Sequence, residues 1–165
     1  MSEKYISIIA LGVSVLSLLL SAFLGFREYN EKVVIEVNSA EIASVDLEGG
    51  DYIDFSADII VANTSKPTVS LIKESAYIGW DEYEIQSSPE LPLSLVQGFA
   101  DKINVRFRYS LSKEQVSNLI NGEELDKGLN HNHISIHLGS ATNKTYYGVI
   151  NLKDIRWSLK DWYKQ

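Results

Sequence analysis

The sequence predicts a mainly β protein, in which an N-terminal transmembrane α-helix precedes an antiparallel β-sandwich with one short inserted helix and a C-terminal helix. Three observations lead to this prediction. Tyr5–Phe26 is an uncharged apolar run, the chain beyond Glu31 alternates polar and apolar residues, and strands do not alternate regularly with helices. This pattern is typical of antiparallel sheets packed face to face rather than of α/β folds.

The apolar run is long enough to cross a bilayer. Its 22 residues would extend roughly 33 Å as a helix, against about 30 Å of hydrocarbon. The alternative is a cleaved signal peptide, which normally ends in paired small residues that Ser21–Phe26 lacks. We therefore expect a single-pass protein of the cell membrane that contacts the lipid bilayer through residues 5–26. Lys4 on one side, with Arg27 and Lys32 on the other, leaves the side of the globular domain undecided, with a slight preference for the cytoplasm.

One face of this helix carries small residues. Ser7, Ala10, Ser14, Ser17 and Ser21 recur with alternating steps of three and four. In lipid, small residues let helix backbones approach closely, which predicts helix–helix association. The alternative is that the serine hydroxyls return their hydrogen bonds to the preceding turn of the same helix.

The expected organisation is a tail, a span, a short linker and one domain, namely residues 1–4, 5–26, 27–32 and 33–165. The last segment is long enough to bury one core. Its first strand begins at Val33, and residues 42–47 either continue it after a bend or form a second strand.

The clearest strand is Asp51–Ala62, which follows a Gly-Gly turn. Its odd-numbered residues from Ile53 to Val61 are apolar, so that they face one way. Residues 63–67 are expected to close a hairpin into a strand that begins at residue 68. Further strands are expected at residues 75–79, 82–86, 103–109, 133–138 and 145–152.

Two segments of the domain are predicted to be helices. Ser112 and Gln115 have the spacing of a capping box, and Asn121-Gly122 ends the helix that they begin. Residues 153–164 form the expected C-terminal helix, because their apolar residues lie one turn apart.

The segment from Asp51 to Leu71 resembles a hairpin of uncharacterised bacterial single-span membrane proteins with an immunoglobulin-like β-sandwich domain. In that hairpin a strand ends in an Asn-x-small turn, matched here by Asn63 and Ser65, and resumes with a Pro-Val-x-Ile type strand, matched by residues 67–71. Ser65 stands where such turns often have glycine. The resemblance implies an immunoglobulin-like sandwich and no activity.

The composition excludes several classes of function. The chain has no cysteine, so disulfides, thiolate metal sites and a cysteine nucleophile are excluded. Its formal net charge is −7. An acidic chain has no general attraction for phosphate backbones, so nucleic acid is not an expected partner.

The three histidines lie in one short segment, as His131, His133 and His137. If this segment is a strand, His131 and His133 share its outer face and could bind one metal ion. His137 lies four residues beyond His133, roughly 13 Å along a strand, which is too far to join them. The alternative is a solvated strand face.

Two further groups are candidates for binding. Asp46, Glu48, Asp51 and Asp54 surround the Gly-Gly turn, but their spacing does not match the calcium-loop pattern, and surface charge is their expected role. Trp80 and Tyr83 form a candidate recognition loop. The favoured alternative is that both rings pack over a sheet edge. The exposure of the two rings distinguishes packing from recognition.

No catalytic motif is present, so we expect no enzyme and no cofactor. The expected function is non-catalytic binding or scaffolding, with a protein partner or self-association, through the sandwich, through helix–helix contacts in the membrane, or both. One alternative is a membrane-tethered metal-binding or metal-dependent hydrolase domain that uses His131 and His133. Another is carbohydrate binding through Trp80 and Tyr83.

Overall fold

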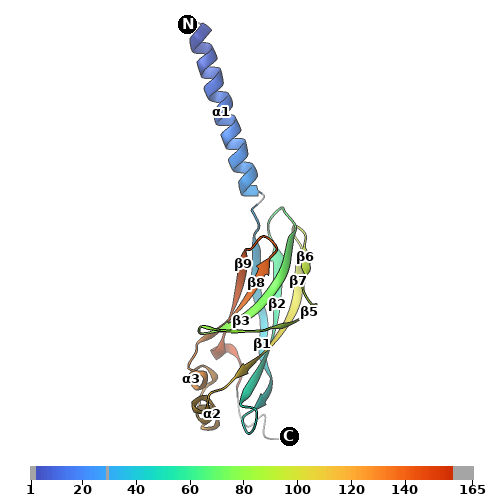
Figure 1. The fold of residues 1–165 in the computed structure, drawn as a ribbon, viewed down its shortest axis with the longest axis vertical. Coiled ribbons are helices and arrows are strands. Elements are labelled where there is room, and N and C mark those ends of the chain that lie inside the picture. Colours follow the sequence, from blue (N-terminus) through green and yellow to red (C-terminus); the bar gives the residue numbers. More distant parts are fainter. Residues whose placement is uncertain (1–2, 29, 158–165) are drawn as a thin grey trace.

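The computed structural model describes residues 3–28 and 30–157 of the chain, and the side chains of residues 11–26 and 30–157. Figure 1 shows a long helix that projects from one end of an elongated β-sandwich, with two short helices near the opposite end. The elements in chain order are α1 (Glu3–Glu28), β1 (Val33–Asp46), β2 (Tyr52–Asn63), β3 (Val69–Ile78), β4 (Asp81–Tyr83), β5 (Gln86–Ser88), β6 (Leu93–Leu95), β7 (Ala100–Ser110), α2 (Lys113–Ile120), α3 (Leu125–Leu129), β8 (His133–Ser140), β9 (Thr145–Asn151) and the 3₁₀ turn η1 (Leu152–Asp154).

The predicted transmembrane helix is wrong for the part of the chain that the structure describes. The helix itself forms, as α1, but no helix among the described residues combines the length and the hydropathy of a membrane span. The side chains described in α1 are those of the sixteen residues 11–26. The membrane location and the lipid contact stay predictions.

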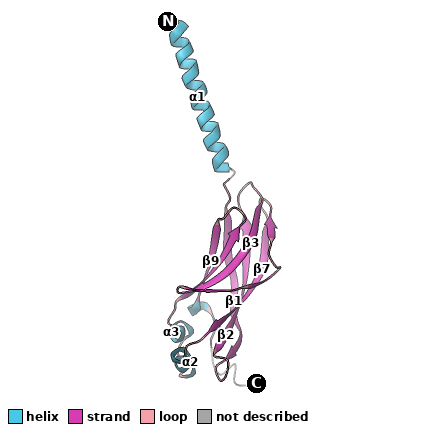
Figure 2. Ribbon diagram, viewed as in Figure 1, coloured by secondary structure: helices cyan, strands magenta, loops and turns pink. Residues whose placement is uncertain are grey.

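Two antiparallel sheets pack face to face, which confirms a mainly β, sandwich-like fold (Figure 2). Sheet A has the strand order β1-β2-β7-β5, and sheet B has the order β4-β3-β8-β9, with β6 paired to β3. All of the described strand pairs are antiparallel. The immunoglobulin-like assignment stays a prediction.

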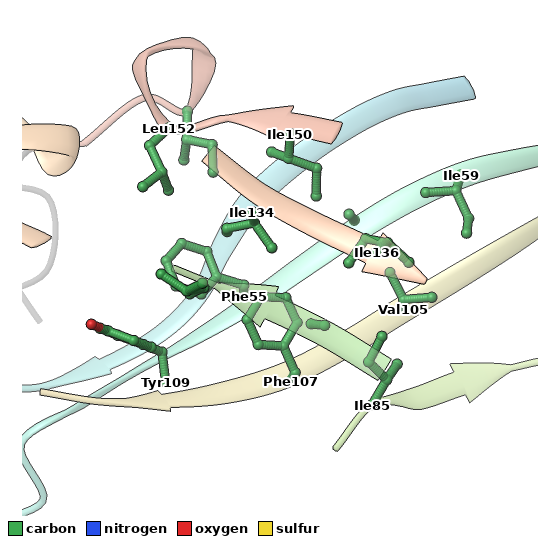
Figure 3. Packing of buried hydrophobic residues seen from close by; sticks show 14 of the residues in the cluster. Phe55, Ile59, Ile85, Val105, Phe107, Tyr109, Ile134, Ile136, Ile150 and Leu152 are labelled. Atoms are coloured by element: carbon green, nitrogen blue, oxygen red, sulfur yellow. The ribbon is translucent and has the colours of Figure 1, made fainter. Parts of the chain in front are cut away.

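The core follows from the alternation along the strands. Phe55 of β2 and Phe107 of β7 are opposite each other in the register, and their rings stack with centroids 5.3 Å apart. Ile134 and Ile136 of sheet B are fully buried between the layers, near these rings (Figure 3). Full burial of one such side chain stabilises the fold by about 1.5–3 kcal/mol, so the two inner faces hold the sheets together.

The expected hairpin after β2 is instead a crossover between the sheets. β2 lies in sheet A and β3 in sheet B, and the two strands do not pair. Turn residues such as those at 63–67 can form a hairpin or a crossover. Here the strand that follows them, residues 69–78, pairs with β8 and not with β2. In this arrangement each of the two strands buries its own apolar face against the other sheet.

The side chain of Asn63 stabilises the crossover between β2 and β3 through hydrogen bonds. Its side-chain amide nitrogen donates to the carbonyl oxygens of Pro67 (2.7 Å) and Leu95 (2.8 Å), and its amide oxygen accepts from the backbone N–H (2.9 Å) and hydroxyl (2.6 Å) of Ser65. Asn63 is only 1% exposed, and Ser65 is also buried. The hydroxyl of Ser65 therefore supplies a bond that a glycine could not.

β9 of sheet B contacts β1 of sheet A. Gly148 of β9 faces this contact, and a Cβ atom at that position would lie 2.7 Å from Cγ2 of Ile35. Only glycine lets the backbone approach so near a branched side chain without displacing it.

β1 is one long strand with irregularities near Asn38 and Ala43, so residues 42–47 continue it, which is one of the two expected alternatives. Other elements depart from the sequence expectations. The strand expected at residues 82–86 is divided between β4 and β5, which lie in different sheets, and β6 and α3 were not expected. The expected C-terminal helix is not present in the described part of residues 153–164. There the chain forms the end of the 3₁₀ turn η1 and is extended at Ile155. Residues 158–165 lie outside the described part.

The segment after α1 is bound to the end of the sandwich. Glu31 accepts hydrogen bonds from the hydroxyls of Thr142 (2.5 Å), Ser140 (3.1 Å) and Tyr146 (3.1 Å). Burial alone would raise the pKa of Glu31, but these three donors and the nearby Lys144 outweigh it and lower that pKa. The carboxylate therefore stays charged and keeps its partners.

Replacing Asn63 with alanine should destabilise the fold by about 3 kcal/mol, because buried backbone groups of Pro67, Leu95 and Ser65 lose their partner. Ser65→Ala is the matched control, and it should cost about 1 kcal/mol because it removes one hydroxyl bond. Urea unfolding followed by intrinsic fluorescence measures both. Equal losses in the two variants would show that Asn63 does not hold the crossover.

Candidate functional site

A row of rings crosses the outer face of sheet B. It consists of Tyr77 on β3, His137 on β8 and Tyr147 on β9, and we call these three residues the aromatic row. The Tyr77 and His137 ring centroids lie 4.4 Å apart, and those of His137 and Tyr147 lie 6.2 Å apart. Tyr147 is 69% exposed. Tyr77 and His137 are half-buried, and adjacent aromatic rings with one exposed member make this face a candidate recognition surface.

The alternation of each strand places these rings outside. Ala76 and Ile78 point into the core, so Tyr77 between them points outward. In the same way, His137 points outward because Ile136 and Leu138 are buried. Strand pairing then brings the rings together, because His137 lies directly opposite Tyr147 in the β8–β9 register.

A carboxylate lies at the β4 end of the row. Glu82 is opposite Tyr77 in the β3–β4 register, and hydrogen bonds from the hydroxyls of Tyr77 and Ser75 lower its pKa. Lys73 lies 3.6 Å from Glu82. Burial among the rings lowers the pKa of His137, although the charge of Glu82 acts in the opposite direction. The row is therefore apolar in the middle and charged at this end.

The structure separates the two residues of the expected recognition loop. Trp80 is in the turn between β3 and β4 and is completely exposed, so the favoured packing role is wrong for this residue. Tyr83 does pack, with its ring centroid 5.3 Å from that of Tyr109 and 6.3 Å from that of Phe107. Burial, followed by the nearby Tyr109 and Asp81, raises the pKa of Tyr83 to about 12.

The histidines have different surroundings. His133 is exposed on β8, and His131 precedes the strand and packs beside Gly79, where a Cβ atom would lie 2.7 Å from its ring. His137 belongs to the aromatic row. Across the described part of the chain, no group of three or more histidine or carboxylate side chains is arranged to hold a metal ion.

Two of the four acidic residues near the Gly-Gly turn, Asp46 and Asp54, hold neighbouring groups in place. Asp46 accepts hydrogen bonds from the backbone N–H groups of the turn, of which that of Gly50 does most to lower its pKa. Asp54 lies on the outer face of sheet A, where it pairs with Arg108.

The small-residue face of α1 is partly described. Ser14, Ser17 and Ser21 are exposed, whereas the side chains of Ser7 and Ala10 lie outside the described residues. Apolar side chains of α1 are exposed as well, at 49–78%. Large exposed apolar surfaces commonly mark contact sites.

Sequence reasoning did not identify Tyr77 and Tyr147 as site residues. The alternation in their strands was a sufficient signal that both face outward. It could not reveal that β3, β8 and β9 are neighbours, because that depends on pairing between segments far apart in the chain.

Comparison with known proteins identifies no family. No protein-family model matches the chain, and no curated protein matches it. Among solved structures, YcdA of Bacillus subtilis aligns with 75% of this chain and 39% of its own, at 10% identity and a TM-score of 0.48. ApaA of Bordetella pertussis aligns over 73% and 89%, at 9% identity and 0.34. The archaellum periplasmic stator protein FlaG of Sulfolobus acidocaldarius aligns over 70% and 100%, at 9% identity and 0.33.

This chain therefore spans well under two thirds of YcdA. At these identities and TM-scores, none of the three likenesses transfers a function to it.

His137 should titrate below the ordinary histidine pKa of about 6.5, because its neighbours exclude water. Tyr147→Ala should raise this pKa by opening the row to solvent. Since folding lowers the pKa, the unfolded chain binds the proton more readily, and stability should fall as the pH drops through about 6.5. NMR titration of the imidazole Cε1–H, assigned with His137→Gln, measures the pKa. Titration at or above the ordinary value would contradict the packing of the row.

Proposed function

We propose that this chain is a non-catalytic binding protein whose sandwich, of the immunoglobulin-like type, holds a protein partner against the aromatic row. The observation that carries the proposal is the row itself, which joins three strands of sheet B and leaves Tyr147 69% exposed. Val149, on the same face of β9, adds an apolar side chain that is 47% exposed.

The composition of this surface favours a protein as the partner. Tyrosine and tryptophan are the residues most enriched at the energetic centres of protein interfaces, and a polar rim normally surrounds such a centre. Here Tyr77 and Tyr147 supply the centre, and Lys73 and Glu82 supply charges at its edge. Trp80 adds a fully exposed ring at the end of β3.

The partner can be captured with a photoreactive phenylalanine analogue in the full chain at Ser135, which faces the same side of β8. The identified protein is then titrated against Tyr147→Ala. We expect at least a tenfold loss of affinity, as for a typical hot-spot tyrosine. Phe99→Ala is the matched control, because Phe99 is an aromatic residue of similar exposure, 65%, away from this face. It should change the affinity less than about twofold.

Equal effects of the two variants, or crosslinks obtained only from a control position on sheet A such as Asn104, would reject the row as the binding surface. Binding of a soluble glycan that Tyr147→Ala abolishes, without any protein crosslink, would reject a protein as the partner.

As a second part of the proposal, α1 joins copies of the chain. Leu16, Leu18 and Phe26 of α1 are 70%, 72% and 78% exposed. Exposed apolar surface of this kind favours packing against another helix, and the small side chains of Ser14, Ser17 and Ser21 let the two backbones approach closely. Self-association would then combine several sandwich domains in one assembly.

Replacing Ser14 and Ser17 with leucine should lower the oligomeric mass of the full chain in sedimentation equilibrium, because bulky side chains keep helix backbones apart. The sandwich should retain its unfolding midpoint. Leu18→Ala, which adds no bulk, is the comparison variant. An unchanged mass for the double leucine variant would argue against a helix pair with this face inside.

A further inference from the structure

The outer face of sheet A carries rungs of polar side chains that extend across neighbouring strands. In one rung, Arg108 of β7 donates two hydrogen bonds to Asp54 of β2, at 2.7 and 2.9 Å. Ser44 of β1 donates to the same carboxylate at 2.6 Å, and the guanidinium lies 3.8 Å from the ring centre of Tyr52. Arg108 therefore has both a carboxylate partner and a ring partner within the sheet.

A second rung is built in the same way. Asp58 of β2 accepts a hydrogen bond from Asn104 of β7 at 2.9 Å, and Lys102 lies 2.8 Å from it. In both rungs a carboxylate on β2 satisfies the donors on β7.

The rung between them lacks its carboxylate. Arg106 of β7 lies opposite Ser56 of β2 on one side and Gln86 of β5 on the other. Ser56 is 4% exposed, and its hydroxyl accepts a hydrogen bond from Asn104 instead. Among the described residues, none forms a hydrogen bond or an ion pair with the Arg106 guanidinium.

An open groove of about 770 Å³ lies over this rung. This volume is within the range of ligand sites, about 300–1,000 Å³. Side chains from four strands or their connections line it, among them Ser44, Asp54, Glu84, Gln86, Arg106 and Arg108.

We propose that Arg106 anchors a carboxylate-bearing ligand in this groove. The neighbouring rung shows the matching chemistry, because Arg108 there holds a carboxylate through two parallel bonds, the strongest geometry that a guanidinium offers. The amide of Gln86 is a second donor on the β5 side of the same rung. The net charge of −7 gives no general attraction for anions, so affinity for a carboxylate would come from this rung alone.

The test is calorimetric titration of the full chain with three probes, namely succinate, a hexaglutamate peptide and inorganic phosphate. We expect saturable binding of a carboxylate probe, with at least a tenfold loss in Arg106→Gln and a smaller loss in Arg106→Lys. Lys102→Gln is the matched control, since it removes an equal charge from the same strand and face. It should change the affinity less than twofold. Binding of the peptide without succinate would identify an acidic protein segment as the source of the carboxylate, and binding of succinate would identify a small molecule.

Three results would overturn the proposal: no saturable binding of either carboxylate, equal losses in Arg106→Gln and Lys102→Gln, or phosphate binding as tight as that of the carboxylates. Arg106 is exposed, so its replacement should leave the unfolding midpoint unchanged, and measurement of that midpoint separates lost binding from lost structure.

Discussion

The buried amide of Asn63 is the interaction on which the arrangement of the two sheets depends. Its side chain binds the crossover and the end of β6, while its backbone accepts from Gly98 and donates to Phe99 just before β7. One residue thus fixes where β2 ends, where β3 begins and where β7 enters sheet A. Both candidate surfaces follow from this placement, because β3 carries Tyr77 and β7 carries Arg106. Buried polar groups that are fully satisfied in this way favour one register over its alternatives.

The parts of the fold that the sequence predicts are those with local causes. The alternation in β2 and β7 specifies their buried faces, and the capping box of α2 forms as expected, with Ser112 and Gln115 bonded reciprocally. The sequence indicates a hairpin at the crossover because both connections begin with the same kind of turn residues, and only the distant partner β8 distinguishes them. The short elements β6 and α3 show no periodicity that the sequence could reveal. Their contacts with neighbouring elements hold them in place.

The candidate surfaces were less predictable for the same reason. Alternation shows that Tyr77, Tyr147 and Arg106 face outward, but not which residues lie beside them. The row requires β3, β8 and β9 to be adjacent, and the incomplete rung requires Ser56 to be opposite Arg106. Conversely, His131 and His133 are close in sequence, but only His133 is on the strand. Proximity along the chain was a poor guide to proximity in space.

The attachment of Glu31 to Ser140, Thr142 and Tyr146 has a mechanical consequence. The three donors come from the end of β8 and the start of β9, the two strands that carry His137 and Tyr147. The attached carboxylate keeps the chain at residue 31 beside the end of the sandwich where β8 ends and β9 begins. A pull on the chain at residue 31 would therefore act directly on β8 and β9, which carry two of the three rings of the row. An array of such chains would present several rows to one multivalent partner, which raises the effective concentration that the partner meets.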